Sequence, residues 1–360
     1  MMTATQGVAE RAGRVHAPTP APDVAIERDD RGWTEYVNAH GAGTGYHDWA
    51  WRRVFEGAFG HEPVYFTARR DGVVVGILPG VLLDSWLFGR ALISLPFVNY
   101  GGVLADDRGS ADALLSAATA FAASKRCKYV ELRHTVQQFS ELPCRRHKVA
   151  MVLKLQAPDA MWNGFDRKVR NQIRKAEKSG LTHEMGGAEL IADFYAVFAR
   201  NMRDLGTPVY GRAFFEQMLA AFPDRTRIHI VRSGSIAAAA GFTFRTRSTL
   251  EIPWASSVRD LNALCPNHLL YWTVLKSAAL EGCGIFDFGR STPDEGTYKF
   301  KEQWGAQPVP LCWEYGLASA ADLPNASPAN PKFRLAIAAW KKLPLGVATR
   351  VGPLIVRSIP

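Results

Sequence analysis

The residues best suited to chemistry gather in one stretch, IFDFGRSTPDEGTYKFKEQWG, which runs from Ile285 to Gly305. An apolar strand leads into Gly289, where the backbone can turn, and Arg290 and Ser291 follow at the carboxyl end of the strand. Because open α/β sheets commonly bind ligands at that end, both side chains are candidate substrate-binding residues. Asp287 alternates with two phenylalanines and therefore points to the opposite face of the strand. In an alternative interpretation, Asp287 and Arg290 form a structural ion pair.

A lysine and a tyrosine follow in the turn-rich segment behind this strand. Lys301 can stabilise a developing oxyanion or hold a phosphate or carboxylate, and Tyr298 can donate a hydrogen bond. The aromatic residues Phe300 and Trp304 are assigned mainly to the core. The Asp-Phe-Gly triplet of the strand does not indicate a protein kinase, because neither an HRD-type catalytic loop nor a GxGxxG loop precedes it.

A second candidate is the basic segment FDRKVRNQIRKAEKSGL, over 165–181. Its spacing predicts an amphipathic helix that carries an apolar stripe opposite its charges and stops at Gly180. Arginine forks suit phosphate groups, so the helix is a candidate polyanion-binding surface; the alternative is a solvated helix face. The residues proposed to bind the polyanion are Arg167, Lys168, Arg170 and Arg174.

Three weaker candidates lie elsewhere. Thr207 and Tyr210 belong to a predicted loop behind a helix, where their hydroxyl groups can line a cleft. Trp254 ends a predicted strand over 250–254 and is included among the substrate-binding candidates. The strand end FVNYGG, over 97–102, allows either close ligand approach or an ordinary turn.

The bulk composition is that of a globular protein, with 360 residues, 47% hydrophobic and 21% charged. The net charge of +9 favours a polyanionic partner: nucleic acid, a phosphorylated substrate or an anionic membrane surface. The five cysteines are scattered, which argues against a disulfide framework or a zinc site and favours a reducing cytoplasm. The histidines show no metal-ligand spacing, so no metal cofactor is expected. No apolar run is long enough to cross a bilayer.

The chain shows signs of an internal repeat. A hairpin pattern near Asp71-Gly72 recurs near Ser233-Gly234, and in each half a further strand (93–97 and 250–254), a helix and an acid-bearing strand follow in the same order. The carboxylates of the two acid-bearing strands are Glu131 and Asp287. This order predicts an α/β protein made of two similar domains from a duplication, although any two α/β segments can look alike by chance.

These motifs together resemble the FemAB-like family. The segments RNQIRKAEKSGL, GTPVY, LLYW, FDFGRS and GTYKFKEQWGA carry the resemblance, which covers roughly residues 30 to 345. The branch that matches best is associated with exosortase/PEP-CTERM systems and exopolysaccharide production. The resemblance implies two tandem GNAT-like domains, of the acyl-CoA N-acyltransferase type, and transfer of an aminoacyl or acyl group to an amine of a cell-envelope or exopolysaccharide-related precursor.

The resemblance also implies roles for individual residues. Phe300 and Lys301 match a Phe-Lys pair near the site that stabilises the transferred carbonyl, and Arg290 and Tyr298 match positions in the same cleft. Lys301, Tyr298 and Asp287 are then the catalytic candidates. The acetyl-CoA signature [QR]xxGx[GA] is absent where the second-domain helix begins, at Cys265. The donor is therefore left open between aminoacyl-tRNA and an acyl thioester such as acyl-CoA, and a non-catalytic polyanion-binding module is a further alternative.

The expected organisation has four parts: a flexible leader over 1–23, an N-terminal domain over 24–150, a C-terminal catalytic domain over 151–318 and a basic tail over 319–360. In the tail, Phe333, Ile337 and Trp340 form an apolar stripe that ends before Pro344. This stripe either packs on the domain or lies on an anionic inner leaflet. The expected location is the cytoplasm, with a possible peripheral contact at the inner membrane.

Overall fold

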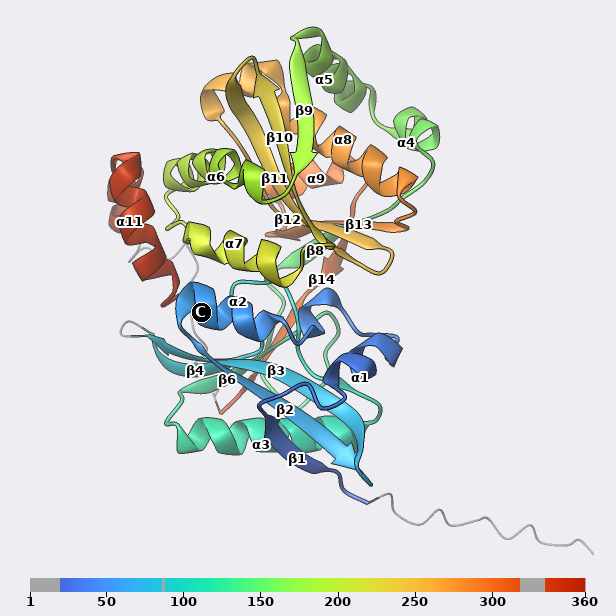
Figure 1. Ribbon diagram of the computed structural model, residues 1–360, viewed down its shortest axis with the longest axis vertical. Helices are drawn as coiled ribbons and strands as arrows, with labels where there is room; N and C mark the ends of the chain where they lie inside the picture. The colour runs from blue at the N-terminus through green and yellow to red at the C-terminus, as the bar shows by residue number, and fades with distance from the viewer. Residues whose placement is uncertain (1–19, 86–87, 318–333, 360) are drawn as a thin grey trace, which may run out of the picture.

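Two mixed β-sheets stacked along the long axis of the molecule organise the fold (Figure 1). The computed structural model describes residues 20–85, 88–317 and 334–359. Most of the predicted leader and the first part of the predicted tail, including Phe333, lie outside these residues. The chain is an α/β protein, as the sequence predicts.

The first sheet follows the order β1-β2-β3-β4-β6-β15-β7, with β5 paired to β3, and the second follows β14-β8-β13-β12-β11-β10-β9. The strands of the first sheet are β1 (Asp23–Glu27), β2 (Glu62–Arg70), β3 (Val73–Ser85), β4 (Gly89–Ile93), β5 (Leu104–Ala105), β6 (Tyr129–His134), β7 (Cys144–Arg145) and β15 (Cys312–Gly316). Those of the second are β8 (Val149–Lys154), β9 (Leu181–Gly186), β10 (Thr226–Ser233), β11 (Ile236–Thr246), β12 (Thr249–Ser257), β13 (Ile285–Ser291) and β14 (Gln307–Pro310).

Helices cover both faces of each sheet. Helices α2 and α7 pack against one another between the two sheets, whereas α3 covers the outer face of the first sheet (Figure 1). The α-helices are α1 (Trp33–Ala39), α2 (Trp51–Phe59), α3 (Arg108–Ser124), α4 (Pro158–Gly164), α5 (Arg167–Lys178), α6 (Ile191–Leu205), α7 (Arg212–Ala221), α8 (Pro266–Leu280), α9 (Gly296–Glu302), α10 (Arg334–Trp340) and α11 (Leu345–Val356). Three short 3₁₀ helices complete the described elements: η1 (Gly45–His47), η2 (Ala188–Leu190) and η3 (Arg259–Leu264).

The two sheets repeat one design, which confirms the duplication. In each, three antiparallel pairings lead to one parallel pair, β4 with β6 and β12 with β13. Each parallel pair is only three residues long: it ends at Ile93↔Glu131 in the first sheet and at Glu251↔Asp287 in the second. Because β12 and β13 both continue beyond that point, they splay apart, and an acidic side chain stands at each opening.

The first sheet is completed by a strand from the far half of the sequence. β15, from near residue 315, pairs with β6 of the first sheet, whereas β8, at the boundary of the two halves, pairs with β13 of the second. The division into sheets therefore differs from a division of the sequence at residue 150. One apolar core runs across this junction, from Trp51 and Phe55 of α2 to Phe214 of α7 and Trp254 of β12.

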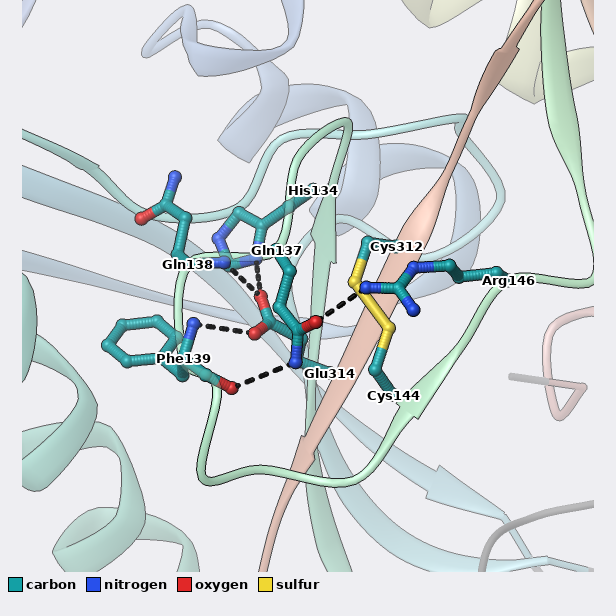
Figure 2. Close-up of a disulfide and its surroundings, with 8 residues drawn as sticks. All are labelled: His134, Gln137, Gln138, Phe139, Cys144, Arg146, Cys312 and Glu314. Atoms are coloured by element: carbon teal, nitrogen blue, oxygen red, sulfur yellow. Dashed lines mark hydrogen bonds and ion pairs between the residues drawn. A yellow bond between two sulfur atoms is a disulfide. The ribbon is translucent and has the colours of Figure 1, made fainter.

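Two sequence-based expectations were wrong. The strand expected over 93–97 ends at Ile93, because Leu95 and Phe97 adopt left-handed backbone conformations with φ of 55° and 70°. The expectation against disulfide bonding that was drawn from the scattered cysteines is also wrong. Cys144 and Cys312 are bonded, because β15 lies beside β7 and brings together residues 168 positions apart in sequence (Figure 2). The scatter of cysteines in the sequence therefore does not argue for a reducing compartment.

The neighbourhood of this disulfide is a closed structural network. Glu314 of β15 accepts hydrogen bonds from the backbone N–H groups of Gln138 and Phe139 and from Nδ1 of His134, at 3.1, 2.6 and 2.6 Å (Figure 2). Nε2 of the same imidazole accepts from the Val103 N–H at 2.8 Å, so Nδ1 carries the proton. His134 thus has the satisfied core role that the sequence favours for the histidines.

The tail packs on the second half of the molecule. Trp340 is buried, and a side chain at Gly206 would collide with Ile337, so the described part of the predicted stripe faces protein. His61 bonds to the carbonyl of Arg357 at 2.8 Å, which ties the chain's end to the first half. In the described residues no helix is both long and apolar enough to cross a bilayer.

Candidate active site

A buried polar cluster lies where β12 and β13 begin to splay. Its members are Tyr46, Asn99, Tyr100, Glu251, Asp287 and Lys301, which we call the polar cluster. The first three belong to the first half of the chain and the last three to the second, so the cluster is assembled across the junction of the two halves. All except Tyr100, which is partly buried, are less than 9% exposed.

Glu251 is held from the first half of the chain. The hydroxyl of Tyr46 donates to Oε2 at 2.7 Å, and the Asn99 amide donates to Oε1 at 2.5 Å. Burial, together with the charge of Asp287, raises the pKa of the Glu251 carboxyl well above its usual range, although both hydrogen bonds oppose the shift. A raised pKa favours the protonated, uncharged form of this carboxyl.

Asp287 is fixed by a turn of its own strand and by a tyrosine. Oδ1 accepts from the N–H of Gly289 at 2.7 Å, and Oδ2 accepts from the hydroxyl of Tyr100 at 2.9 Å. Gly289, with φ of 76°, forms the irregularity in β13 between Asp287 and Arg290. Burial raises the pKa of Asp287, and these two hydrogen bonds lower it in part. In the described chain Asp287 and Arg290 form no ion pair, so the structural alternative for these two residues was wrong.

Lys301 projects from α9 into the cluster. Its Nζ donates to the carbonyl oxygens of Gly289 and Arg290, both at 3.0 Å, and so holds the turn of β13 in place. Burial lowers the pKa of Lys301 to about 8, and the charges of Asp287 and Glu251 oppose this shift. An ammonium group has three N–H donors. The two carbonyl contacts use two of these donors and leave the third for another partner, and the nearby opposite charges are those of Asp287 and Glu251.

Arg290 lies on the side of the cluster that faces Tyr210. Its guanidinium stacks over the Trp313 ring at 5.3 Å and makes no ion pair with any described residue. Burial, and secondarily the charge of Arg133, lowers its pKa. Burial raises the pKa of the Tyr210 hydroxyl, and the charge of Arg290 opposes this shift. An unpaired, partly buried guanidinium is suited to an anionic group of a substrate.

The remaining predicted residues are spread more widely. Ser291 is buried, and its Oγ has no hydrogen-bond partner among the described residues. Tyr298 and Phe300 are partly buried against the second core, where Phe300 contacts the ring of His268 at 5.4 Å. Trp254 belongs to the central core. Thr207 is exposed in the loop behind α6, apart from the polar cluster.

The basic helix forms as predicted and borders a groove. Val169, Ile173 and Ala176 are its buried stripe, and Gly180 has φ of 72° just behind its end. A groove of about 520 Å³, which we call the α5 groove, separates α5 from the start of α8. It is lined by Asp166, Arg167, Lys168, Asn171, Gln172, Lys175 and Cys265. Of the four predicted polyanion-binding residues, Arg170 and Arg174 lie outside this lining, and Arg174 covers the Trp162 ring at 5.3 Å.

The first turn of α8 lies between the α5 groove and helix α9, which carries Lys301. The charge of Lys168 acts on His268, whose pKa burial lowers to about 4, so the two side chains are close. The His268 ring contacts Phe300, the residue before Lys301. A second pocket, of about 300 Å³, reaches Tyr46, Tyr100 and Glu251 from the opposite, glycine-rich loop over 41–45.

Four members of the polar cluster were not proposed as site residues from the sequence: Tyr46, Asn99, Tyr100 and Glu251. The segment 97–102 was recognised as a place for close ligand approach, but its partners were not. One signal was available for Glu251, since an acid in an otherwise apolar strand is rarely buried without a partner or a function. In the described residues, no group of three or more metal-binding side chains gathers.

The repeated sheets and their short parallel pairs define a protein with two tandem GNAT folds. Residues 164–302 match the acetyltransferase (GNAT) domain family, and the chain is an enzyme of the transferase class. A crystal structure of FemX is similar, with a TM-score of 0.59 at 14% identity, over 88% of this chain and 100% of that one.

Two further structures share the tandem fold. A tandem GNAT protein from the clavulanic acid biosynthesis pathway has a TM-score of 0.54 at 13% identity, over 82% of this chain and 97% of that one. L-PGS from Bacillus licheniformis has a TM-score of 0.54 at 11% identity, over 93% and 98%. At these identities the likeness extends to the fold alone. No curated protein sequence matches the chain.

Proposed function

We propose that the protein is a FemAB-like transferase that moves an aminoacyl or acyl group from an activated donor to an amine of a cell-envelope or exopolysaccharide-related precursor. The observation that carries this proposal is the polar cluster, in which a buried lysine and two carboxyls of raised pKa meet at a strand splay. The resemblance to the branch associated with PEP-CTERM systems supplies the precursor class. The proposed location is the cytoplasm, at the inner membrane surface.

The reaction is an attack of the acceptor amine on the carbonyl of an ester or thioester. A C–N bond forms, the C–O or C–S bond breaks, and the amine gives up a proton. The N–H of Lys301 that is directed away from the backbone carbonyls stabilises the developing oxyanion. The carboxyl pair, Glu251 and Asp287, takes the amine proton and returns it to the leaving oxygen or sulfur.

The substrates are assigned to the two open regions. The donor's phosphates bind in the α5 groove at Arg167, Lys168 and Lys175, because arginine and lysine side chains attract a polyanion. The acceptor amine enters by the pocket at Tyr46 and Tyr100, because this pocket also reaches Glu251. Arg290 holds an anionic group of one substrate. Aminoacyl-tRNA and acyl-CoA remain the two candidate donors.

The deciding experiment incubates the full chain with charged tRNA, and separately with acyl-CoA, in the presence of a cell-envelope extract. Mass spectrometry should detect one acylated amine product with one of the donors. The Lys301→Ala variant should form no product while its circular dichroism spectrum is unchanged. Undiminished turnover by that variant would remove Lys301 from the mechanism, and absence of product with both donors would favour a polyanion-binding module.

The donor site has its own test on the same helix. The variant R167E/K168E/K175E reverses three charges that line the α5 groove, and should weaken donor binding by at least tenfold. The matched control is Lys178→Glu, because Lys178 is exposed on α5 but lies outside the groove lining. Equal losses in both variants would indicate a diffuse charge effect and would contradict a site in the groove.

A further inference from the structure

Helix α11 presents its larger apolar side chains to solvent. Its buried residues are Ala348, Gly352 and Val356, a narrow face at spacing i, i+4 and i+8. On the opposite side, Val347, Val351 and Leu354 are 42%, 38% and 64% exposed. A surface helix normally turns its apolar stripe toward the protein and polar residues toward water. The outward side of α11, Val347, Arg350, Val351 and Leu354, which we call the outer face, reverses that rule.

Close packing on the inner side fixes which residues point outward. A Cβ at Gly352 would lie 2.9 Å from the backbone N of Val209, and a Cβ at Gly211 would lie 3.5 Å from Pro353. The carbonyl of Arg357 is also bonded to His61. Helix α11 therefore sits tightly on the loop between α6 and α7, at the edge of the molecule (Figure 1). Rotation of α11 to bury the outer face would lose these contacts.

The charged residues of the segment that contains α10 and α11 are all of one sign. From residue 334 to residue 359 the sequence has no acidic residue. The basic residues of that segment are all exposed: Arg334, Lys341, Lys342, Arg350 and Arg357. Leu335 of α10 adds a further apolar side chain, 86% exposed. Exposed aliphatic residues in a segment whose only charges are basic match an anionic lipid surface, in which apolar side chains enter the acyl boundary while lysine and arginine meet the headgroups.

From these observations we propose that the outer face of α11 docks the protein on an anionic phospholipid bilayer. A second copy of the chain is the less suitable occupant, because a symmetric contact through this face would bring the same cations together. Docking here places the loop between α6 and α7, on which α11 packs, on the membrane side of the molecule. The docking itself stands independently of the proposed transferase reaction.

The test is co-sedimentation of the full chain with vesicles. We expect binding to vesicles of equal parts phosphatidylglycerol and phosphatidylcholine, and none to phosphatidylcholine alone. The variant V351Q/L354Q removes apolar contact without changing charge, and should weaken binding by about tenfold or more. The control is Val73→Gln, since Val73 is 66% exposed at a distant turn and its loss should leave binding unchanged.

A second measurement reports contact directly. Tryptophan placed by Leu354→Trp should shift its fluorescence to the blue when anionic vesicles are added, whereas Val73→Trp should not. Failure of the full chain to bind anionic vesicles would overturn the proposal, as would unchanged binding by V351Q/L354Q. A dimer in solution that V351Q/L354Q dissociates, without vesicle binding, would assign the outer face to self-association instead. All readouts are independent of turnover.

Discussion

The charge of Lys301 is the residue-scale feature with the most direct consequence for pH dependence. Burial lowers its pKa to about 8, so the ammonium that would stabilise the oxyanion is lost as the pH rises through that value. We expect kcat/KM to fall above about pH 8 in the wild type. In Lys301→Arg the guanidinium stays charged, and the falling limb should disappear, whatever the absolute rate. Measurement of kcat/KM against pH for both proteins tests this.

Stability should move in the opposite direction over the same range. The pKa of Lys301 is lower in the folded chain than the ordinary lysine value of 10.5, so the unfolded chain binds more protons between about pH 8 and 10.5. This group alone therefore makes folding more favourable as the pH rises through that window. A loss of activity above pH 8 that coincides with a drop in melting temperature would contradict the assignment to Lys301.

The carboxyl of Glu251 gives a second residue-scale prediction. We expect Glu251→Gln to lower the rate of transfer by about a hundredfold or more, because the amide cannot accept the amine proton. The pKa of Glu251 is higher in the folded chain than in the unfolded chain. The protonated carboxyl therefore favours folding at low pH, and this contribution to the free energy of unfolding is lost as the pH rises through the folded-state pKa. The variant should thus be as stable as the wild type at neutral pH or more so. Strong destabilisation with an unchanged rate would make Glu251 structural.

At the scale of elements, the turn at Gly289 joins strand geometry to the site. Gly289→Ala places a side chain on a backbone with φ of 76°, which costs about 1 kcal/mol of folding free energy. Gly282→Ala is a matched control, because Gly282 has φ of 80°, open space around it and no part in the polar cluster. Thermal unfolding should show similar losses for both. Only Gly289→Ala should reduce transfer, since Asp287 and Lys301 both bond to this turn.

A transfer rate that falls equally in both glycine variants would mean that lost stability explains the effect. If Gly289→Ala keeps the full rate of transfer, the position of this turn does not affect the reaction. The two glycines thus separate strain in the backbone from placement of the catalytic groups.

Elements with local signals could be predicted from the sequence, whereas their long-range partners could not. The apolar spacing of α5 and the glycine at its end predict this helix. The repeat of hairpin, helix and strand predicts the two similar folds. Tyr46 and Glu251, however, are 205 residues apart and share no pattern that joins them. The left-handed turn at Leu95 and Phe97 could not be predicted from the sequence either, because no local sequence pattern marks apolar residues that adopt this conformation.

The pairing of β15 with the first sheet was missed for the same physical reason. β15 is short, and its local sequence pattern would allow it to pair with an edge strand of either sheet. Its partner is decided by the whole first sheet, by Glu314, and by the neighbouring Cys144. A boundary drawn from sequence order therefore separates residues that one sheet needs together.

At the scale of the whole molecule, this exchange and the shared core predict that the two halves do not unfold separately. A chain ending at Pro310 lacks β15, so β6 loses one of its two neighbours, and the buried amide of Phe139 and the part-buried amide of Gln138 lose Glu314 as acceptor. Unpaired buried backbone groups cost about 1–3 kcal/mol each. Because the core from α2 to α7 is continuous, this loss reaches the second half as well.

The expected result is one cooperative transition in calorimetry for the full chain and none for the chain ending at Pro310. A chain ending at Leu317 keeps β15 and loses only the tail, so it should retain a single transition at a lower temperature. Two separate transitions in the full chain would contradict a single cooperative unit. A normal cooperative transition in the chain ending at Pro310 would contradict it as well. A single cooperative unit matters for function because the polar cluster takes Tyr46, Asn99 and Tyr100 from one half and Glu251, Asp287 and Lys301 from the other. Local unfolding of either half would disassemble the site.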